Sequence, residues 1–227
     1  MSDETHVVLV DDDDLVRMGL RAMLDGLEGI RVVGEASDGA EVPSVIAARR
    51  PHVVLMDLRM KNVDGITATR RLQHVPDRPA VIVLTTFDDN ELVTNAIGAG
   101  AIGFLLKHAP PEDIVRAIGA ARRGESRFSP EIATQLRTIV ADSARDTTDQ
   151  TMARERLHPL SARELQVASA VSEGKSNAEI AAGLSLTMPT IKSYISDILA
   201  KTNTSNRVQL AVLIHRARLA KPNNGDR

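Results

Sequence analysis

Acidic residues directly follow two of the most apolar stretches of the chain. Val53 to Met56 form a run typical of a buried parallel strand, and Asp57 comes next. His6 to Val10 form a second run, and Asp11 to Asp14 follow it. Ligands of open α/β sheets bind beyond the carboxyl ends of strands, which makes Asp57 a candidate reactive group. The structural alternatives are a solvated Asp57 that opens a loop, and helix caps among the other four carboxylates.

Two further predicted strands end in residues that suit phosphate chemistry: Thr85 follows 79–84, and Lys107 follows 101–106. The crowded carboxylates of Asp11, Asp12 and Asp57 would repel one another, so their charged forms need a cation, and Mg²⁺ suits such oxygen ligands. A carboxylate near that ion can attack phosphorus and become an aspartyl phosphate. The Lys107 ammonium and the Thr85 hydroxyl would help to stabilise the charge on the transferred group.

These residues meet only if the apolar runs form one sheet. Five predicted strands (near 6–10, 31–36, 53–57, 79–84 and 101–106) alternate with five predicted helices. This alternation predicts an α/β fold, a parallel sheet with helices on both faces, and the flavodoxin-like strand order 2-1-3-4-5 is a common solution. In that order the first, third and fourth strands are central neighbours, so the candidate residues converge at one edge.

The residues at these strand ends resemble a known family. Val10-Asp11-Asp12, Leu55-Met56-Asp57, Leu84-Thr85-Thr86 and Gly103 to Lys107 look like the signature positions of a response-regulator receiver domain, over about residues 6 to 123. The resemblance implies that Asp57 accepts phosphate from a histidine kinase.

The same resemblance implies roles for the neighbouring residues. Asp12, Asp57 and the backbone carbonyl of Arg59 would bind Mg²⁺, with Asp11 acting alongside. Thr85 and Phe104 resemble the switch pair, whose coupled movement reshapes one face of the domain. Lys61 stands where many relatives carry Pro, so we expect a less rigid loop after Asp57.

Composition divides the chain into parts with different charge. The 227 residues carry a net charge of −2, made up of −5 in residues 1–124, −1 in 125–156 and +4 in 157–227. The basic C-terminal part is a candidate for nucleic-acid binding. The absence of Cys excludes disulfides, thiolate catalysis and Cys-ligated zinc. No apolar run approaches the roughly 18 residues of a membrane span, and we expect a cytoplasmic protein with no membrane partner.

The predicted domains are a receiver at 1–124, a linker at 125–156 and a second domain at 157–227. Within the linker, Pro130 to Val140 has helical spacing, whereas Ala141 to Arg156 is polar and is interpreted as a hinge. Interdomain geometry is therefore open.

The last part of the chain predicts four short helices. Ser161 with Glu164 and Ser176 with Glu179 have the spacing of capping boxes, and Thr187 is the expected cap of a third helix. A fourth helix is expected at roughly 205–219. This pattern fits a helix-turn-helix and a helical dimerisation bundle about equally well.

Residue identities favour the first of these two alternatives. Leu160 to Glu164, Gly174 to Ala181 and Thr190 to Lys192 resemble the LuxR-type DNA-binding domain over about 157 to 220. With the receiver, this is the layout of the NarL/FixJ subfamily. The resemblance implies that Thr187 to Lys201 is a recognition helix in the major groove. The candidate DNA contacts are Lys192, Ser193 and Ser196 in the groove, and Thr190, Asn177 and Lys201 on the backbone.

We therefore expect a DNA-binding transcriptional response regulator that forms a homodimer on phosphorylation and binds double-stranded promoter DNA. It would be no enzyme beyond assisting its own phosphorylation and dephosphorylation. One alternative is an aspartyl-phosphate phosphohydrolase, although the usual second Asp, two positions after the nucleophile, is Arg59 here. Another is a DNA binder that works independently of phosphorylation.

Overall fold

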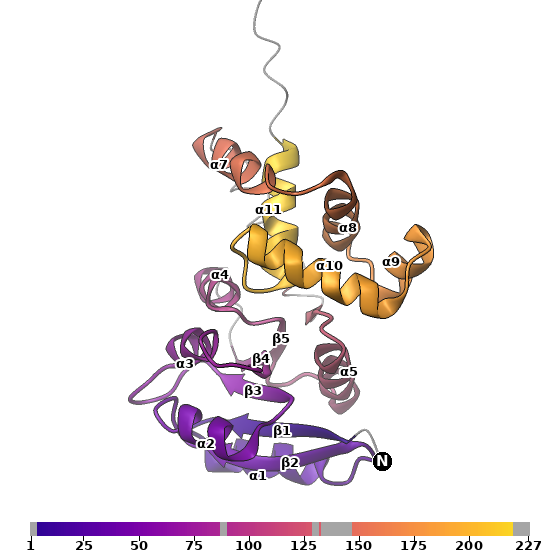
Figure 1. The fold of residues 1–227 in the computed structure, drawn as a ribbon. Helices are drawn as coiled ribbons and strands as arrows, with labels where there is room; N and C mark the ends of the chain where they lie inside the picture. The colour runs from indigo at the N-terminus through magenta and orange to yellow at the C-terminus, as the bar shows by residue number, and fades with distance from the viewer. Residues whose placement is uncertain (1–3, 87–89, 129–131, 133–146, 220–227) are drawn as a thin grey trace, which may run out of the picture. The chain divides into compact units, whose positions relative to one another are not determined.

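The predicted strands form a single parallel sheet in the computed structural model, which describes residues 4–86, 90–128, 132 and 147–219. The chain divides into two units, Met1–Gln135 and Leu136–Arg227. In the first unit strands and helices alternate (Figure 1), in the order β1 (Thr5–Val10), α1 (Asp14–Leu24), β2 (Ile30–Ala36), α2 (Val42–Arg49), β3 (Val53–Asp57), α3 (Gly65–Leu72), β4 (Ala80–Thr85), α4 (Asn90–Ala99), β5 (Gly103–Leu106), α5 (Pro111–Arg122) and β6 (Arg127–Phe128).

Alternate residues of each central strand pack into two separate cores. Val7, Leu9 and Leu55 belong to a core that includes Ile114 and Ile118 of α5. The intervening residues of the same strands pack against α2 and α3, and this second core contains Val8, Val10, Val54, Met56, Val42, Ile46, Ala68 and Leu72. Because side chains of a strand alternate between faces, both faces of the sheet are covered, and the chemistry is confined to strand ends.

The sheet has one strand more than the sequence predicts. Its order in the described residues is β2-β1-β3-β4-β5-β6, so the predicted order 2-1-3-4-5 is correct but incomplete. Gly124 has a φ of 75° after α5, and Arg127 and Phe128 then pair with Gly103 and Phe104. A strand of two residues is too short to produce a detectable periodicity.

Among its described residues, 147–219, the second unit contains the four predicted helices and one more: α7 (Thr147–Leu157), α8 (Ala162–Ser172), α9 (Asn177–Leu184), α10 (Met188–Lys201) and α11 (Arg207–Leu219). Both predicted capping boxes are present, and Thr187 caps α10. The core is formed mainly by α8 to α11 and includes Val167, Ile180, Ile191 and Leu210. Ser185, in the left-handed region at φ 54°, begins the tight turn between α9 and α10.

Helix α7 corrects the interpretation of the hinge over its described part, residues 147–156. Ala153 is buried with Leu213 and Ala217 of α11, and Arg156 donates hydrogen bonds to the carbonyls of Thr202 and Asn203. Because α7 is anchored by Ala153, by Leu157 at its end and by Arg154 and Arg156, its sequence lacks the apolar periodicity of a packed helix. The predicted helical segment Pro130 to Val140 lies outside the described residues, except for Ile132.

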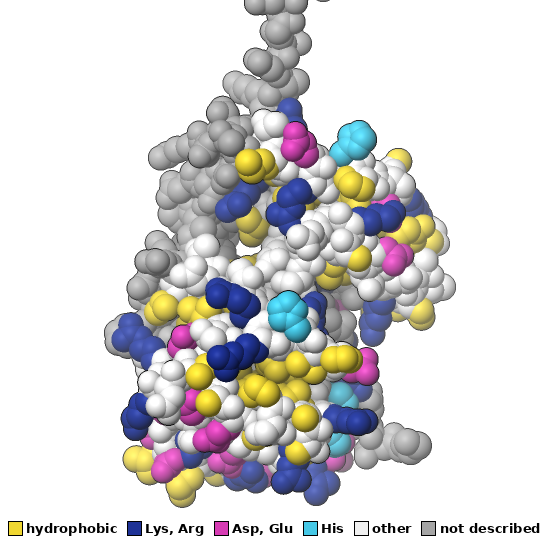
Figure 2. Space-filling view, turned by 60° about the vertical axis from the view of Figure 1, so that its left-hand side comes forward, with side chains coloured by type: hydrophobic (Ala, Val, Ile, Leu, Met, Phe, Trp, Pro, Cys, Tyr) yellow, Lys and Arg dark blue, Asp and Glu magenta, His cyan; other side chains and the backbone are white. Residues whose placement is uncertain are grey.

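The face of the molecule drawn in Figure 2 mixes charges of both signs. Figure 2 shows Lys and Arg side chains on both units, with acidic side chains among them rather than a single large basic patch. Within the described ranges, no helix is long and apolar enough to cross a membrane.

The cap of α8 generates a prediction about pH. Glu164 accepts hydrogen bonds from Lys201 Nζ at 2.7 Å and from the Ser161 backbone at 2.8 Å. These contacts, Lys201 first, lower the pKa of Glu164 from 4.5 to about 2. A lowered folded-state pKa stabilises the fold above pH 4.5, and this contribution disappears as the pH falls through about 2. We expect the second unit of the Glu164→Gln variant to be less stable at neutral pH and less sensitive to acid.

The fluorescence of Tyr194 measures this effect in the full chain, because it is the single Tyr and Trp is absent. Glu179→Gln is the matched control: Glu179 makes the same reciprocal cap, and its pKa is lowered mainly by Ser176. Equal acid sensitivity of the Glu164→Gln and wild-type proteins would contradict the prediction.

Candidate functional site

Lys107 lies between two buried carboxylates at the carboxyl ends of the strands. Its Nζ is 2.6 Å from Oδ2 of Asp11 and 3.1 Å from Oδ2 of Asp57. The side chains of Asp11 and Asp57 are only 2% and 6% exposed, so these ion pairs are poorly screened by solvent. β1 and β3 are neighbours, whereas Lys107 follows β5 and reaches back past β4. The predicted convergence of these three residues is confirmed.

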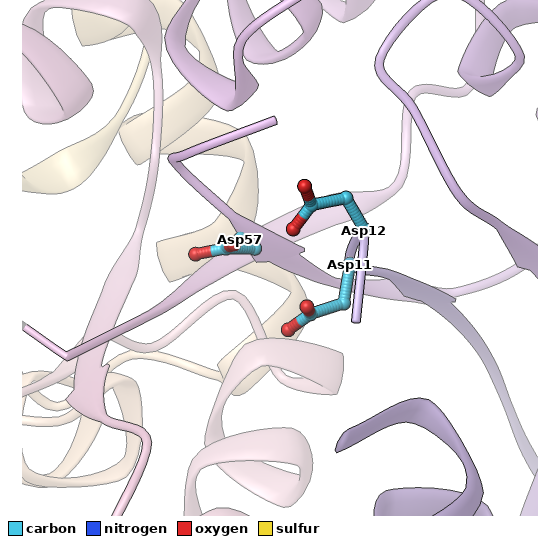
Figure 3. A group of neighbouring side chains, drawn as sticks. All are labelled: Asp11, Asp12 and Asp57. Carbon is cyan, nitrogen blue, oxygen red and sulfur yellow. The ribbon is translucent and has the colours of Figure 1, made fainter. Parts of the chain in front are cut away.

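Asp12 adds a third carboxylate to this pair. Asp11, Asp12 and Asp57 can each offer one oxygen, and these oxygens lie within 4.8 Å of one another. Figure 3 shows Asp11 and Asp12 next to each other after β1, with their carboxyl groups on the same side as that of Asp57 at the end of β3. Three carboxylates against one ammonium leave an excess of negative charge. Hard cations such as Mg²⁺ bind to oxygen ligands of this kind.

The pKa shifts follow from burial and from this pairing. Burial raises the pKa of Asp57 above 3.8, although Lys107 acts in the opposite direction. For Lys107, burial alone favours the neutral amine, but the hydrogen bond with Asp11 and the charge of Asp57 prevail and raise its pKa above 10.5. The site therefore holds a charged lysine beside a carboxylate whose ionised form is costly.

The predicted switch residues lie near the ends of neighbouring strands. Leu84, the residue before Thr85, is the β4 partner of Asp57, and the carbonyl of Thr85 accepts a 2.7 Å hydrogen bond from the Lys107 N–H. Thr85 is 1% exposed and Phe104 is fully buried. The N–H of Arg59 donates to the Asp57 carboxylate and opposes the rise in its pKa. The role of the Arg59 carbonyl stays a prediction.

Two residues that sequence reasoning missed support the site. Arg17 donates hydrogen bonds to the carbonyl of Asp11 and to Asp14, and its side chain is 12% exposed. Gly65 is the first residue of α3 and lies against the backbone of Asp57. A Cβ added at Gly65 would lie 1.9 Å from the Asp57 carbonyl oxygen. In the sequence, Arg17 looks like a polar position of an amphipathic helix, and Gly65 looks like an ordinary turn residue. Asp13, one of the four carboxylates after β1 among which helix caps are expected, is the N-cap of α1.

The candidate DNA contacts fall into two groups. Lys192, Ser193 and Ser196 are exposed on α10, and Thr190 is half-buried near its start. Asn177 is buried and accepts a 3.3 Å hydrogen bond from Arg207, and Lys201 donates to Glu164. These contacts give Asn177 and Lys201 roles inside the unit, and their contacts with DNA stay a prediction.

Known proteins share both units in the same order. Residues 7–119 match the response regulator receiver domain, and residues 158–214 match the luxR family of bacterial regulatory proteins. The transcriptional regulatory protein LiaR of Bacillus subtilis (strain 168) is 39% identical over 214 residues, which cover 94% of this chain and 98% of LiaR. This chain belongs to the NarL/FixJ-type response regulators.

Solved structures agree with this assignment. ChrA, the response regulator of a heme-sensing two-component system, is 34% identical with a TM-score of 0.53, over 96% of this chain and 100% of ChrA. A complex of the response regulator RcsB with DNA is 25% identical with a TM-score of 0.56, over 96% of this chain and 100% of RcsB. The chain is thus a DNA-binding transcriptional response regulator of a two-component system, with a receiver domain and a LuxR-type helix-turn-helix.

The ion pairs of Lys107 generate a prediction about the stability of this response regulator. Lys107→Met would leave two buried carboxylates without their shared ammonium, and we expect the first unit to lose about 3–5 kcal/mol. Asp57→Asn should instead stabilise the first unit, because the raised pKa means that the fold disfavours the charged carboxylate.

Denaturant unfolding followed by circular dichroism without divalent ions measures both effects. Tyr194 lies in the second unit, so a transition that circular dichroism detects and Tyr194 fluorescence does not belongs to the first unit. The control is Lys61→Met, which changes an exposed residue and should stay within about 0.5 kcal/mol of wild type. A Lys107→Met variant as stable as this control would contradict the predicted loss.

Proposed function

We propose that Asp57 accepts a phosphoryl group from the phosphohistidine of a histidine kinase. The observation that carries this proposal is the contact of Lys107 with both Asp11 and Asp57 at the rim of the sheet. This contact places a cation beside a carboxylate whose burial makes its charge costly. Conversion of this carboxylate into an acyl phosphate removes the negative charge of the buried carboxylate. The new negative charge is spread over the phosphoryl oxygens, where cations can stabilise it.

The residues of the chain have separate tasks in this reaction. An oxygen of Asp57 forms a bond to phosphorus while the phosphorus–nitrogen bond of the kinase breaks and the imidazole leaves. The Lys107 ammonium is close enough to pair with the transferred oxygens. Thr85 follows Leu84, the β4 residue paired with Asp57, and its hydroxyl is the expected hydrogen-bond donor to the phosphoryl group. Phosphorylation adds about −1.5 to −2 of charge, which draws such donors towards Asp57.

We infer that Mg²⁺ binds among these carboxylates. Asp12, Asp57 and the Arg59 carbonyl would hold it, with Asp11 alongside. Three carboxylate oxygens within 4.8 Å of one another, with only one ammonium for them, fit a hard divalent cation. Bound Mg²⁺ supplies positive charge to the phosphoryl oxygens. The chain would catalyse no reaction on other substrates and would only assist its own phosphorylation and dephosphorylation.

Labelling with acetyl phosphate tests the acceptor directly. Asp57→Asn should abolish labelling in the presence of Mg²⁺, because it replaces the proposed acceptor carboxylate, whose Oδ2 lies 3.1 Å from the Lys107 Nζ, with an amide. Asp14→Asn is the control, since Asp14 is exposed at the start of α1 and should label normally. Persistent labelling of Asp57→Asn would move the acceptor elsewhere, and turnover of free phosphoesters would favour a phosphohydrolase.

We propose further that phosphorylation promotes a homodimer that binds promoter DNA through α10. Lys192, Ser193 and Ser196 are exposed on this helix, while Ile191 and Ile198 are buried. Residues three or four positions apart lie on one helix face, so these polar side chains can enter the major groove together. The RcsB–DNA complex supports DNA as the ligand of this unit.

Salt-dependent binding tests the role of Lys192. We expect Lys192→Ala to weaken binding to a promoter fragment recovered by genome-wide footprinting, and to lower the salt slope by about 1 if Lys192 contacts phosphate. Fluorescence polarisation of labelled DNA at several salt concentrations measures both quantities. Lys61→Ala makes the same charge change in the receiver, and equal affinities of the two variants would contradict the assignment. A DNA affinity unchanged by phosphorylation would favour the phosphorylation-independent alternative.

A further inference from the structure

Asp38 is a buried carboxylate in the turn after β2 that accepts hydrogen bonds from three backbone N–H groups. It is 6% exposed, and its Oδ1 accepts hydrogen bonds from the N–H groups of Ala40 at 2.9 Å and Val63 at 3.1 Å. Its Oδ2 accepts from the N–H of Asn62 at 2.8 Å. Two of these three donors are more than twenty residues away, in the loop between Asp57 and α3. Asp38 therefore joins two loops at the same edge of the sheet.

The neighbouring residue completes this contact in the opposite direction. The N–H of Gly39 donates a 3.1 Å hydrogen bond to the carbonyl of Val63. A Cβ on Gly39 would lie 2.4 Å from that oxygen, so only glycine permits this approach. Together, the contacts of Asp38 and Gly39 with Asn62 and Val63 form what we call the loop clasp.

The loop clasp restrains the segment that follows the phosphoacceptor. At the base of this loop the N–H of Gly65 donates to the carbonyl of Leu58 at 3.0 Å. The loop clasp holds its far side, so residues 59–61 lie between two fixed points. Arg59 is in this span, and its N–H donates to the Asp57 carboxylate.

We propose that Asp38 is a positioning residue for the metal-binding and phosphoacceptor site, acting through the backbone around Arg59. This inference rests on the proposed function, because it assumes that the Arg59 carbonyl and Asp57 share a divalent cation. A backbone carbonyl can bind an ion well only if its loop is held in place beforehand. Lys61 occupies a position where proline would stiffen the loop, and the loop clasp supplies this restraint from outside.

The chemistry of Asp38 fits positioning rather than ion binding. Its carboxylate uses both oxygens for backbone donors, and no Lys or Arg in the described part of the chain forms an ion pair with it. Hydrogen bonds from Ala40 and Asn62, in that order, lower its pKa below 3.8 and keep it charged. Charge-assisted hydrogen bonds of this kind are about twice as strong as neutral ones. An amide at this position would turn a donor towards at least one backbone N–H.

Titration of the full-length protein with Mn²⁺, followed by the loss of the free-ion electron paramagnetic resonance signal, tests the proposal without phosphorylation. We expect Asp38→Asn to raise the dissociation constant about 10-fold, the lower range for losing a supporting contact of a metal ligand. Gly39→Ala should act in the same direction, because it pushes Val63 away while leaving the carboxylate intact. All variants are compared at a temperature where circular dichroism shows them folded.

Asp64→Asn is the matched control. Asp64 ends the same loop, but it caps α3 by accepting from the N–H of Thr67 at 2.7 Å and takes no part in the loop clasp. Because Asn is about as good a helix cap as Asp, this variant should change thermal stability little and leave the Mn²⁺ affinity unchanged. Labelling of Asp38→Asn by acetyl phosphate should be slow at low Mg²⁺ and approach the wild-type rate when Mg²⁺ saturates.

The outcomes separate this proposal from the proposed function. If the wild-type protein binds no Mn²⁺, the metal site itself is wrong. If the wild-type protein binds Mn²⁺ and both Asp38→Asn and Gly39→Ala bind it equally well, Asp38 only stabilises the turn and the positioning role is overturned. A labelling rate of Asp38→Asn that stays low at saturating Mg²⁺ would also overturn it, because the defect would then not lie in ion binding.

Discussion

The contact of one lysine with two buried carboxylates is the interaction on which the receiver unit depends. Lys107 reaches Asp11 and Asp57 from a strand that is not adjacent to either of theirs, so the contact exists only when β1, β3, β4 and β5 are aligned. Removing the carboxylates of Asp11 and Asp57 from water without a partner would cost several kcal/mol each. The fold offsets this cost with one ammonium and with backbone donors, and leaves negative charge in excess. That excess makes the site responsive to a divalent cation and to phosphorylation.

Much of this site could be predicted from the sequence, because the residues that matter stand at strand ends. An apolar run predicts a buried strand, and the polar residue after it must lie at the rim whatever the detailed packing. Asp11, Asp57, Thr85 and Lys107 are all of this type. The two-residue strand β6 and helix α7 gave no such signal, because neither has an apolar pattern of its own. Strand β6 is held by its pairing with β5. Helix α7 is held by its contacts with α11 and with the turn that precedes α11.

The supporting residues escaped prediction for a related reason. Asp38, Arg17 and Gly65 act through backbone atoms of other elements, and a backbone partner leaves no trace in residue identity. Ser37-Asp38-Gly39 is an ordinary turn sequence, and nothing in it indicates that the carboxylate holds a loop beginning twenty residues later. The expectation that Lys61 leaves this loop less rigid considered the loop alone. In the structure Asp38 holds the far side of this loop through hydrogen bonds at 2.8 and 3.1 Å.

The charge of the second unit shows how an overall count can mislead. Residues 157–227 carry a surplus of four positive charges, which suggests a basic surface. Several of these cations are engaged inside the unit, since Lys201 pairs with Glu164, Arg207 donates to Asn177 and to the Lys175 carbonyl, and Arg163 donates to the Leu184 carbonyl. They stabilise helix ends and turns, where positive charge is favoured by unpaired carbonyls. The surplus already counts Glu164 against Lys201, and bonds to neutral oxygens leave the arginine charges in place, but these contacts hold the side chains against the unit. Under the proposed function, recognition would depend on where the exposed residues of α10 lie as well as on this modest positive charge.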